Sequence, residues 1–327
     1  MKAIVIHEDG GPEVLQYEDA PDPVAGPGEV LIRLRAASLN HLDVFTRMGL
    51  PSVPKPRILG ADGAGTVEAL GEGVTGLEPG EPVVINPGIE HDGVIHVIGE
   101  HMQGVHAELA AIPATNVYPL RTGVSFEEAA AFPLVFETAY RMLVTRAGLR
   151  EGEWVLIWGI GGGVATAALR IAQALGARTI VTSGSDEKLA KAAALGADAT
   201  VNHADGDVVA TVKEATGKGV DVVVETVGDA TWRRSLDAAR PGGRVVVCGA
   251  TSGPNPPAAL HRLWWKQLDL LGSSMGTRAD FEGAYDLVAA GATPVIDSVL
   301  PLAEARAAHE RLESGEQFGK IVLSIPN

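Results

Sequence analysis

The chain has 327 residues, of which 46% are hydrophobic, and its formal net charge is −15 at pH 7. That length allows one large or two ordinary domains with packed cores, and the surplus negative charge argues against a nucleic-acid or anionic-membrane partner. Cys248 is the only cysteine, which excludes an intramolecular disulfide and a cysteine-based zinc site and fits a reducing cytoplasm. The apolar run at the start is too short for a signal peptide, and no stretch reaches the roughly 18 apolar residues of a membrane span.

The first third of the chain has the pattern of short β-strands separated by Pro- and Gly-rich turns, which indicates a compact β-barrel or sandwich. The predicted strands cover residues 3–6, 29–38, 65–70, 81–85 and 107–112. At residue 125 the hydrophobic period changes. Ser125 and Glu128 form a capping-box signal, and the apolar spacing after them predicts a helix over residues 125–149.

From residue 153 onward, strand and helix patterns alternate. Six apolar strands, from "WVLIWG" to "LDLLGSS", are separated by helical segments. This alternation predicts an α/β fold with a doubly wound, six-stranded parallel Rossmann sheet. The chain end returns to strands around one helix, and we expect it to pack on the N-terminal part. The predicted domains are therefore a β-rich domain of residues 1–120 and 292–327 and a dinucleotide-binding domain of residues 121–291.

A glycine-rich turn follows the first strand of the predicted sheet. The segment "GIGGGVATAALRIA" contains Gly159, Gly161, Gly162 and Gly163, with Val164 at the sixth position of the usual G-x-G-x-x-G pattern. Glycines let the backbone approach a pyrophosphate closely, and free N–H groups at the start of the next helix favour an anion. Because this run joins a strand to a helix inside a βαβ unit, it predicts a dinucleotide site rather than a plain turn.

The second strand ends in "VTSGSDEKL", at the position where a residue beside the adenosine ribose decides between cofactors. Enzymes that use NAD commonly have Asp or Glu there, for the 2′-hydroxyl. This chain has instead Ser183, Gly184, Ser185 and Lys188. Small hydroxyls and a cation suit a 2′-phosphate, so the sequence favours NADPH over NADH, although Asp186 is close by.

Further candidate cofactor contacts follow the later strands, because open parallel sheets bind ligands at the carboxyl ends of their strands. The segment "GSSMG" after the sixth strand is expected to pass the nicotinamide, and the histidine after the third strand is a candidate for the 2′-phosphate or a structural residue. The candidates are His203, Thr226, Gly249, Ala250, Thr251, Ser273 and Met275.

Longer segments resemble one family from end to end. "LGADGAGTVEALGEGVTGLEPGEPVV", "FPLVFETAYRML" and "FGKIVL" are similar to signatures of the medium-chain dehydrogenase/reductase superfamily. The resemblance implies a GroES-like catalytic domain, completed by the C-terminal segment, and a Rossmann NADP(H)-binding domain. It also implies a homodimer formed through the edge of the Rossmann sheet.

The zinc-dependent members of that family have ligands that this chain lacks. Asn40 in "NHLD" stands where they have the first cysteine ligand, Ala61 in "GAD" replaces their histidine ligand, and Asp62 replaces the glutamate that follows it. Catalytic zinc needs about three protein ligands around an open position, so we expect no zinc. What remains is similar to the zinc-independent quinone oxidoreductases and enone reductases, although Phe45 stands where many of them have a tyrosine.

The resemblance also implies roles for single residues near the nicotinamide. Asn40 is expected to hydrogen-bond a substrate carbonyl or the carboxamide, or else to form a turn. Thr138 is expected close to the nicotinamide. Asp43 is a candidate catalytic group, with a helix or turn cap as the alternative.

Four more residues have roles that the resemblance or their exposure suggests. His41 and Lys320 are candidate cofactor contacts, and each has a structural or surface role as its alternative. Phe45 and Trp264 are candidates for the substrate side, and Trp264 is alternatively a core or dimer-interface residue.

Residues 86–109 contain four histidines at five-residue steps, His91, His96, His101 and His106. A five-residue step puts successive side chains on opposite faces of a strand, so we expect the four not to converge on a metal. Compared with the family, the segment resembles the shortened remainder of a lobe that holds a structural zinc in relatives.

These features lead to one main hypothesis and two alternatives. The main hypothesis is an NADPH-dependent, zinc-independent reductase that transfers hydride to an apolar conjugated carbonyl such as a quinone or an enone. Hydrogen bonds would then polarise the carbonyl in place of a Lewis acid. The first alternative is an alcohol or aldehyde dehydrogenase with a non-standard metal site built from His41, Asp62 or Glu137. The second is an NADPH-binding sensor without turnover.

Overall fold

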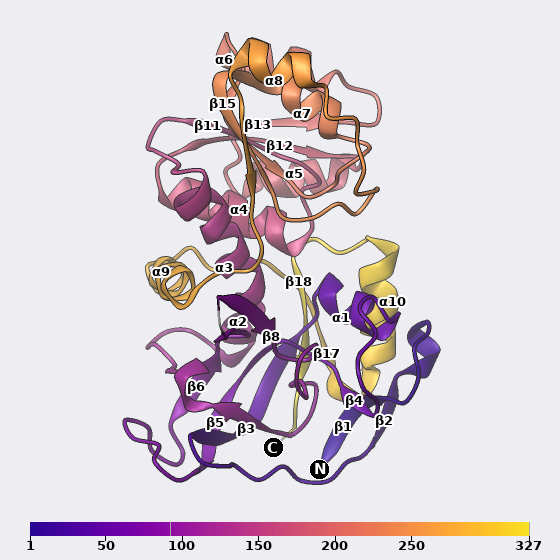
Figure 1. Ribbon diagram of the computed structural model, residues 1–327, viewed down its shortest axis with the longest axis vertical. Coiled ribbons are helices and arrows are strands. Elements are labelled where there is room, and N and C mark those ends of the chain that lie inside the picture. The colour runs from indigo at the N-terminus through magenta and orange to yellow at the C-terminus, as the bar shows by residue number, and fades with distance from the viewer. Residues whose placement is uncertain (92, 327) are drawn as a thin grey trace. The chain divides into compact units, whose positions relative to one another are not determined.

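The computed structural model describes residues 1–91 and 93–326 (Figure 1). They form two compact units, one of residues 1–134 with 288–327 and the other of residues 135–287. The division falls within helix α3 (Pro133–Tyr140) and within helix α9 (Arg278–Ala289). The domain boundaries expected near residues 120 and 291 stay predictions, whereas the fold class, a β-rich domain with a Rossmann domain, is confirmed.

The first unit is built on a seven-stranded sheet in the order β10–β6–β5–β3–β18–β17, with β9 paired to β3. Its strands are β3 (Glu29–Ser38), β5 (Asp62–Leu70), β6 (Pro82–Ile85), β9 (Leu109–Pro113), β10 (Val117–Pro119), β17 (Ile296–Pro301) and β18 (Lys320–Ser324). A three-stranded sheet in the order β2–β1–β4 and the hairpin β7–β8 accompany it. Their strands are β1 (Lys2–Ile6), β2 (Gln16–Asp19), β4 (Arg57–Ile58), β7 (Gly88–His91) and β8 (Val94–Val97).

Strand β3 shows why this sheet forms. Alternate side chains point to one face of a strand, and Val30, Ile32 and Leu34 are fully buried in the core of the unit. The C-terminal strand β18 pairs antiparallel with β3, opposite Ser38 at its end. Residues from the two ends of the chain therefore share one sheet, and they bring Lys320 next to the end of β3.

The helices of the first unit are short. They are α1 (His41–Arg47), α2 (Phe126–Ala131) and α10 (Ala305–Ser314). The predicted capping box is present, because Ser125 Oγ accepts the Glu128 N–H at 3.2 Å and Glu128 accepts the Ser125 N–H at 3.0 Å. The prediction of one continuous helix over residues 125–149 is wrong. Proline has no N–H to donate within a helix, and the segment divides at Pro133 into α2, α3 and the π-helix η3 (Arg141–Arg146).

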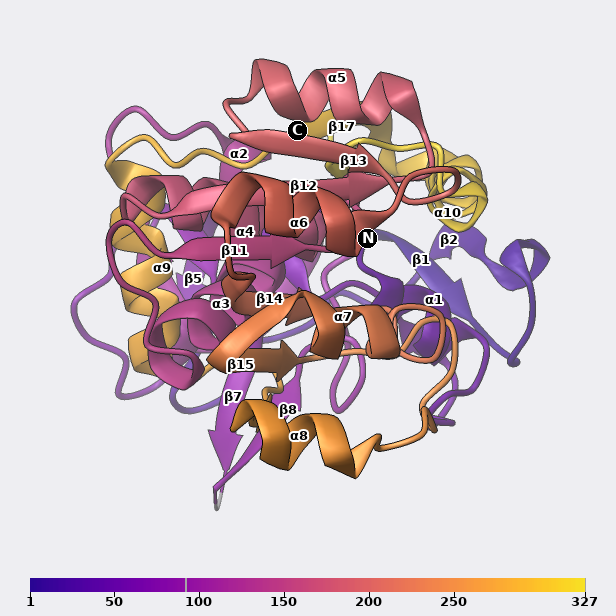
Figure 2. The ribbon, with the colours of Figure 1, turned by 90° about the horizontal axis from the view of Figure 1, so that it is seen from above.

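The second unit is the predicted doubly wound sheet, with six parallel strands in the order β13–β12–β11–β14–β15–β16. The strands are β11 (Trp154–Ile157), β12 (Arg178–Ser183), β13 (Ala199–Asn202), β14 (Val220–Glu225), β15 (Ala239–Val247) and β16 (Asp269–Gly272). Every residue of β14 is buried, as expected for a strand covered on both faces. Figure 2 shows the sheet with α5 along β13 at one end and α8 beside β15 toward the other.

The helices of the second unit alternate with these strands. They are α4 (Gly163–Ala174), α5 (Asp186–Ala194), α6 (Val208–Thr216), α7 (Trp232–Ala238) and α8 (Leu260–Lys266), with α9 at the division. Helix α8 was not among the predicted elements, and it has no buried residue. No helix within the described residues is long and apolar enough to cross a membrane.

Candidate active site

A buried polar cluster in the first unit joins Asn40, Asp62 and Lys320. The Lys320 Nζ donates to Asn40 Oδ1 at 2.5 Å and to Asp62 Oδ2 at 3.2 Å, and Asn40 Nδ2 donates to Asp62 Oδ2 at 2.9 Å. The three residues are at most 5% exposed. Ser38 and the backbone N–H of Leu134 also donate to the Asp62 carboxylate, at 3.3 Å and 2.9 Å. A buried charge is tolerated when it is paired and hydrogen-bonded, and here both conditions hold.

These partners fix the orientation of the Asn40 amide. An ammonium only donates and a carboxylate only accepts, so the oxygen of Asn40 faces Lys320 and its nitrogen faces Asp62. The amide nitrogen has a second hydrogen to donate. Desolvation lowers the pKa of Lys320, while its contact with Asp62 acts in the opposite direction. Lys320 was predicted as a cofactor contact, and the structure places its ammonium inside this cluster instead; the contact stays a prediction.

Asp43 lies beside the cluster and caps the start of α1. Its two carboxylate oxygens accept the N–H of Asn40 at 2.7 Å and the N–H of Gly60 at 3.1 Å. Burial raises the pKa of Asp43 to about 7, against the effect of these backbone hydrogen bonds. The side chain is 2% exposed, so its geometry is that of the capping alternative, and its catalytic role stays a prediction.

The exposed side of α1 carries the other two residues predicted in this region. His41 is the first residue of the helix and is exposed, and its ring centroid lies 6.4 Å from that of Phe45. Phe45, Met48 and Leu50 are 40%, 48% and 64% exposed. The segment that follows Asn40 in the chain therefore presents exposed apolar side chains.

Asn40, Ala61 and Asp62 stand where zinc-dependent members of the family have ligands or their neighbour, and they do not form a zinc site here. Ala61 has no donor atom, the Asn40 oxygen accepts from an ammonium, and both Asp62 oxygens accept hydrogen bonds. Within residues 1–91 and 93–326, no group of three or more His, Cys, Asp or Glu side chains could hold a metal. Zinc needs about three converging ligands, so the donor set does not fit it.

In the second unit, the glycine-rich loop is shaped for an anion. Gly159 and Gly161 have φ of 66° and 123°, which non-glycine residues avoid. Gly162 caps α4, whose first residues are Gly163 and Val164. Apart from the two chain neighbours of Gly159, no heavy atom of the described residues lies within 4 Å of the place where a Cβ at Gly159 would be. The loop thus offers open space beside a helix start, which fits the pyrophosphate of a dinucleotide.

The ends of β12 and β13 bring the predicted ribose-site residues together. The Ser185 N–H donates to Ser183 Oγ at 3.1 Å, and Ser185 Oγ accepts the Lys188 N–H at 3.4 Å. His203 lies beside them, because its N–H donates to the Ser183 carbonyl at 3.0 Å and its ring approaches Gly184. The structure therefore groups these five predicted residues at one edge of the sheet.

The ends of the remaining strands form a second group. The Thr251 N–H donates to the Thr226 carbonyl at 3.3 Å, and a Cβ at Gly249 would lie 3.2 Å from the same oxygen. Ala250 lies between them in sequence and is exposed.

The segment after β16 meets Thr138. The Ser273 N–H donates to the Val247 carbonyl at 2.8 Å. The Thr138 hydroxyl lies 4.0 Å from the sulfur of Met275, which has a positive φ of 48°. Thr138, predicted near the nicotinamide, and Met275, predicted as a cofactor contact, therefore touch each other.

Trp264 lies on α8 and is 65% exposed, and its ring packs edge-on against that of Trp265 at a centroid distance of 5.6 Å. It is therefore not a core residue. Its predicted substrate role and the interface alternative both stay predictions.

Three of the four histidines in this segment lie together instead of on opposite faces of a strand, whereas the expectation that the four hold no metal stays a prediction. Strands β7 and β8 form a hairpin in which Ile89 is opposite His96 and His91 is opposite Val94, so the chain reverses between His91 and His96. The rings of His91 and His96 lie 5.7 Å apart, and those of His96 and His101 stack at 4.4 Å. Only His106 lies elsewhere, buried near the Ser38 carbonyl.

This histidine group is still a poor metal site. The His101 Nδ1 accepts the Val97 N–H at 3.0 Å, so in the neutral ring the hydrogen is on Nε2. The rings of His96 and His101 are nearly parallel, at 10°, and parallel stacked rings do not point their nitrogens at one ion.

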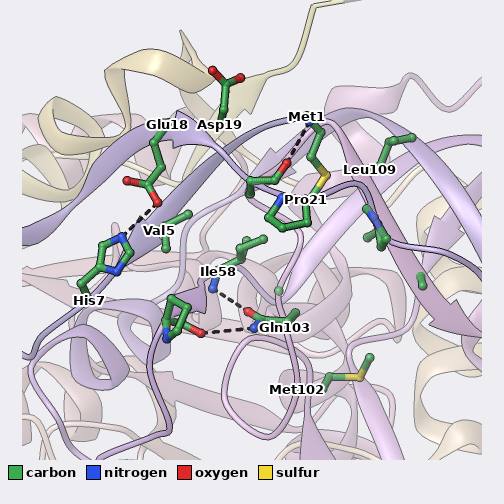
Figure 3. A pocket seen from close by; sticks show the side chains of 16 residues that line it. Met1, Val5, His7, Glu18, Asp19, Pro21, Ile58, Met102, Gln103 and Leu109 are labelled. Carbon is green, nitrogen blue, oxygen red and sulfur yellow. Dashed lines mark hydrogen bonds and ion pairs between the residues drawn. The ribbon is translucent and has the colours of Figure 1, made fainter.

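A cavity of about 540 Å³ lies elsewhere in the first unit (Figure 3). Its lining includes Val5, Ile58 and Leu109, and the hydrogen bond between His7 and Glu18, at 2.9 Å, lies at its side. No residue predicted for cofactor, substrate or catalysis lines it. The candidate active site is therefore separate from this cavity.

Two polar residues near the strand ends of the second unit were not predicted from the sequence. Glu225, at the end of β14, is fully buried and accepts hydrogen bonds from the N–H groups of Val227 and Gly228 and from Thr231 and Ser235. An acidic residue ending the apolar run "VDVVVE" was the available signal. The second is Arg234 on α7, which nothing in the sequence distinguished from its exposed neighbour Arg233.

Comparison with known proteins assigns the family. Residues 26–122 match the family described as "Alcohol dehydrogenase GroES-like domain", and residues 163–290 match "Zinc-binding dehydrogenase". The quinone oxidoreductase of Pseudomonas aeruginosa is 35% identical over 96% of this chain and 96% of its own length. The chain belongs to the medium-chain dehydrogenase/reductase superfamily, in its quinone oxidoreductase-like branch. As a member of that branch, the protein is an oxidoreductase.

Two further similar proteins match almost the whole length of this chain. The acryloyl-coenzyme A reductase of Metallosphaera sedula is 33% identical over 99% of this chain and 100% of its own. A crystal structure described as an NAD-dependent alcohol dehydrogenase is 42% identical, with a TM-score of 0.96, and covers 100% of both chains.

Proposed function

We propose that this oxidoreductase reduces an apolar, conjugated carbonyl compound with NADPH and without zinc. The observation that carries the proposal is the cluster of Lys320, Asn40 and Asp62, which puts a hydrogen-bonded ammonium where zinc-dependent relatives would need ligands. The names of two relatives, a quinone oxidoreductase and an acryloyl-coenzyme A reductase, support a conjugated acceptor.

The chemistry follows from what the side chains can donate. NADPH, when bound, supplies the hydride. Asn40 Nδ2 donates one of its two hydrogens to Asp62. We propose that it donates the second to the carbonyl oxygen of the substrate. Lys320 keeps the amide in that orientation by occupying its oxygen. A neutral N–H stabilises a developing oxyanion less than a metal does, which suits an acceptor that spreads charge over a conjugated system. Water supplies the second proton.

The exposed side chains that follow Asn40 in the chain suit an apolar substrate. Phe45, Met48 and Leu50 offer exposed apolar side chains on the same unit. Burial of such surface contributes about 25 cal/mol per Å². We therefore expect affinity to rise with the apolar area of the quinone or enone.

One observation favours a second candidate, an alcohol dehydrogenase that uses NAD. The similar crystal structure is described as an NAD-dependent alcohol dehydrogenase. Alcohol oxidation needs an alkoxide to be stabilised, usually by a metal, and the donor set here does not fit zinc. We therefore rank it second.

A screen of cofactor oxidation separates these candidates. Purified protein is mixed with NADPH or NADH and with quinones, enones or saturated aldehydes, before and after chelator treatment, with metal content measured in parallel. We expect rapid, chelator-resistant NADPH oxidation with quinones or enones. Zinc-dependent oxidation of simple alcohols would support the second candidate instead. Tight NADPH binding without any turnover would mean a sensor.

The role of Asn40 has its own test. We expect Asn40→Ala to lower kcat by about 100- to 1,000-fold, because it removes one hydrogen-bond donor to the oxyanion, and to leave the dissociation constant of NADPH unchanged. Asn116→Ala, at a buried asparagine that binds backbone carbonyls elsewhere in the unit, controls for general loss of packing. Equal losses in the two variants would contradict a catalytic role.

We also propose a cytoplasmic homodimer formed through the exposed edge strand β16. An edge strand offers unpaired backbone groups to a second copy, and Leu270 on β16 is 40% exposed. The single cysteine supports a reducing compartment. Leu270→Asp is expected to give monomers in light scattering, whereas Val299→Asp, at the edge strand of the other unit and 48% exposed, leaves dimers. Monomeric wild-type protein would contradict the proposal.

A further inference from the structure

The carboxyl ends of β12 and β13 place His203 against the segment that follows β12. Ser183 is opposite Asn202 in the parallel register, so the next residues, Gly184 and His203, are neighbours at the same edge. A Cβ at Gly184 would lie 3.5 Å from the His203 Nε2. This ring nitrogen therefore faces the turn where a ribose would be recognised.

The orientation of the His203 ring is set by Thr182. The Thr182 Oγ1 accepts the N–H of Gly159 at 3.2 Å and lies 3.1 Å from the His203 Nδ1. A hydroxyl has one hydrogen to donate, and Nδ1 is in place to accept it. In the tautomer whose Nδ1 accepts this hydrogen, and in the protonated ring, Nε2 carries a hydrogen and is a donor toward Gly184.

The acidic side chain that follows Ser185 in the chain, Asp186, is held by another partner. Asp186 Oδ1 accepts a hydrogen bond from Asn202 Nδ2 at 2.8 Å, in the first turn of α5. A carboxylate that receives the ribose 2′-hydroxyl is the usual mark of NAD selection. Here the position directly after β12 has a serine and a glycine, and the acidic group is bound to Asn202.

Arg234 adds a permanent positive charge to this edge. Its guanidinium lies 4.9 Å from the ring centroid of Trp158, its Nη2 donates to the Ala230 carbonyl at 3.1 Å, and its Nη1 donates to the His203 carbonyl at 3.5 Å. Two carbonyl bonds use two of the five N–H donors of a guanidinium. Stacking on Trp158 holds the planar group beside His203, and arginine recognises phosphate through paired donors.

We propose that Arg234 is the residue that selects NADPH, binding the adenosine 2′-phosphate together with His203, Lys188 and the hydroxyls of Ser183 and Ser185. This inference rests on the NADPH-dependent function proposed above. It goes beyond that function by naming the charged residue that distinguishes NADPH from NADH. Ser183 ends β12, and Ser185 and Lys188 follow it at the start of α5, whereas Arg234 comes from α7. The phosphate would thus be held from two sides, and Arg234 is charged at every pH of interest.

The test compares two adjacent arginines on α7. Arg234→Gln is expected to weaken binding of NADPH and of the probe 2′,5′-ADP by about 10- to 100-fold, which corresponds to one lost charge-assisted hydrogen bond. Binding of NADH and of 5′-AMP should change by less than about twofold. Arg233→Gln is the matched control, because Arg233 is exposed and pairs only loosely with Asp237 at 3.9 Å.

A pH series gives a second readout. Burial and the charge of Arg234 lower the pKa of free His203, and a bound phosphate dianion would favour the protonated ring. Because a phosphate monoester itself takes up a proton at about pH 6, the readout is the difference between wild type and His203→Asn. As pH falls, wild-type protein should bind 2′,5′-ADP increasingly more tightly than the variant does, whereas the two proteins should bind 5′-AMP alike at every pH.

The outcomes separate this inference from the proposed function. Equal loss for NADPH and NADH in Arg234→Gln would show a structural role and overturn the inference, as would wild-type protein that binds 5′-AMP as tightly as 2′,5′-ADP. A wild type that binds 2′,5′-ADP through Arg234 but oxidises NADPH with no quinone or enone would overturn the proposed reaction alone.

Discussion

The two units use buried polar groups in opposite ways. In the first unit, Asn40, Asp62 and Lys320 come from distant segments and bind one another inside the core. In the second unit, the polar groups follow the ends of successive strands, and many of them are backbone N–H groups or small hydroxyls. The contrast suggests that changes in the first cluster disturb the fold as well as the chemistry, whereas changes at the strand ends mainly disturb binding.

The strongest test of this contrast removes one hydrogen-bonded lysine from each unit, Lys320, which is buried, and Lys266, which is half-buried. Lys320→Met leaves Asp62 charged and unpaired in the core, which costs about 3–5 kcal/mol of unfolding free energy. Lys266→Met in the second unit removes an ammonium that donates to three backbone carbonyls, of Leu236, Asp237 and Ala239. We expect a smaller loss, about 1–3 kcal/mol. Urea unfolding measures both, and equal losses would contradict the contrast.

A smaller effect concerns acid stability in the first unit. Burial lowers the pKa of His106 from 6.5 to about 4, so the unfolded chain binds this proton before the folded chain does, and stability falls as pH drops from 6.5 to 4. Asp43 acts oppositely, because its folded pKa of about 7 exceeds the usual 3.8, and stability falls as pH rises between those values. Each group contributes a slope of about 1.4 kcal/mol per pH unit.

Variants of these two residues separate the opposing slopes. Asp43→Asn should steepen the loss of stability between pH 6.5 and 4.5, and His106→Gln should flatten it, by urea unfolding at several pH values. The slope is compared rather than the absolute stability, because either change also alters packing. Parallel slopes in wild type and both variants would contradict the role of these groups.

In the second unit, the glycine loop gives a test with a modest cost in stability. Gly161 and Gly217 both have positive φ, 123° and 75°, so alanine at either place strains the backbone by about 1–3 kcal/mol. Only Gly161→Ala is expected to weaken NADPH binding, because Gly217 ends α6, away from the glycine loop. Fluorescence titration with NADPH and thermal unfolding distinguish them. Full NADPH affinity in Gly161→Ala would contradict the site.

The smallest expected effect is at the surface of the first unit. Arg33 makes two hydrogen bonds of 2.8 Å to Glu68, yet the two side chains are 38% and 40% exposed. Solvent screens such a pair, so a double-mutant cycle of Arg33→Gln and Glu68→Gln should give at most about 1 kcal/mol of coupling. A coupling energy as large as the loss expected for Lys320→Met would show that burial is not what makes the Lys320–Asp62 pair more important than the Arg33–Glu68 pair.

Local patterns made the second unit predictable. The glycine run, the six apolar strands and the serines after β12 are contiguous in sequence, and the parallel sheet then gathers them at one edge. The capping box at Ser125 was predictable for the same reason, and Pro133 was an available signal for the helix division that was missed.

Long-range contacts made the first cluster unpredictable in detail. Asp62 and Lys320 are 258 residues apart, and they come together because β5 and β18 both pair with β3. The expected alternation of the histidine side chains was wrong for a different reason. It was treated as one strand, but Gly93, with φ of 79°, lies at a hairpin turn, and the reversal puts His91 and His96 on one face.

The place of β18 in the sheet has a consequence for the order of events during synthesis. The second unit is one continuous stretch of chain, so it can fold as soon as it has left the ribosome. The first unit has to wait, because two of its strands and the lysine that neutralises Asp62 are made last. We expect ribosome-bound chains that stop before residue 320 to contain a protease-resistant second unit and an unfinished first one.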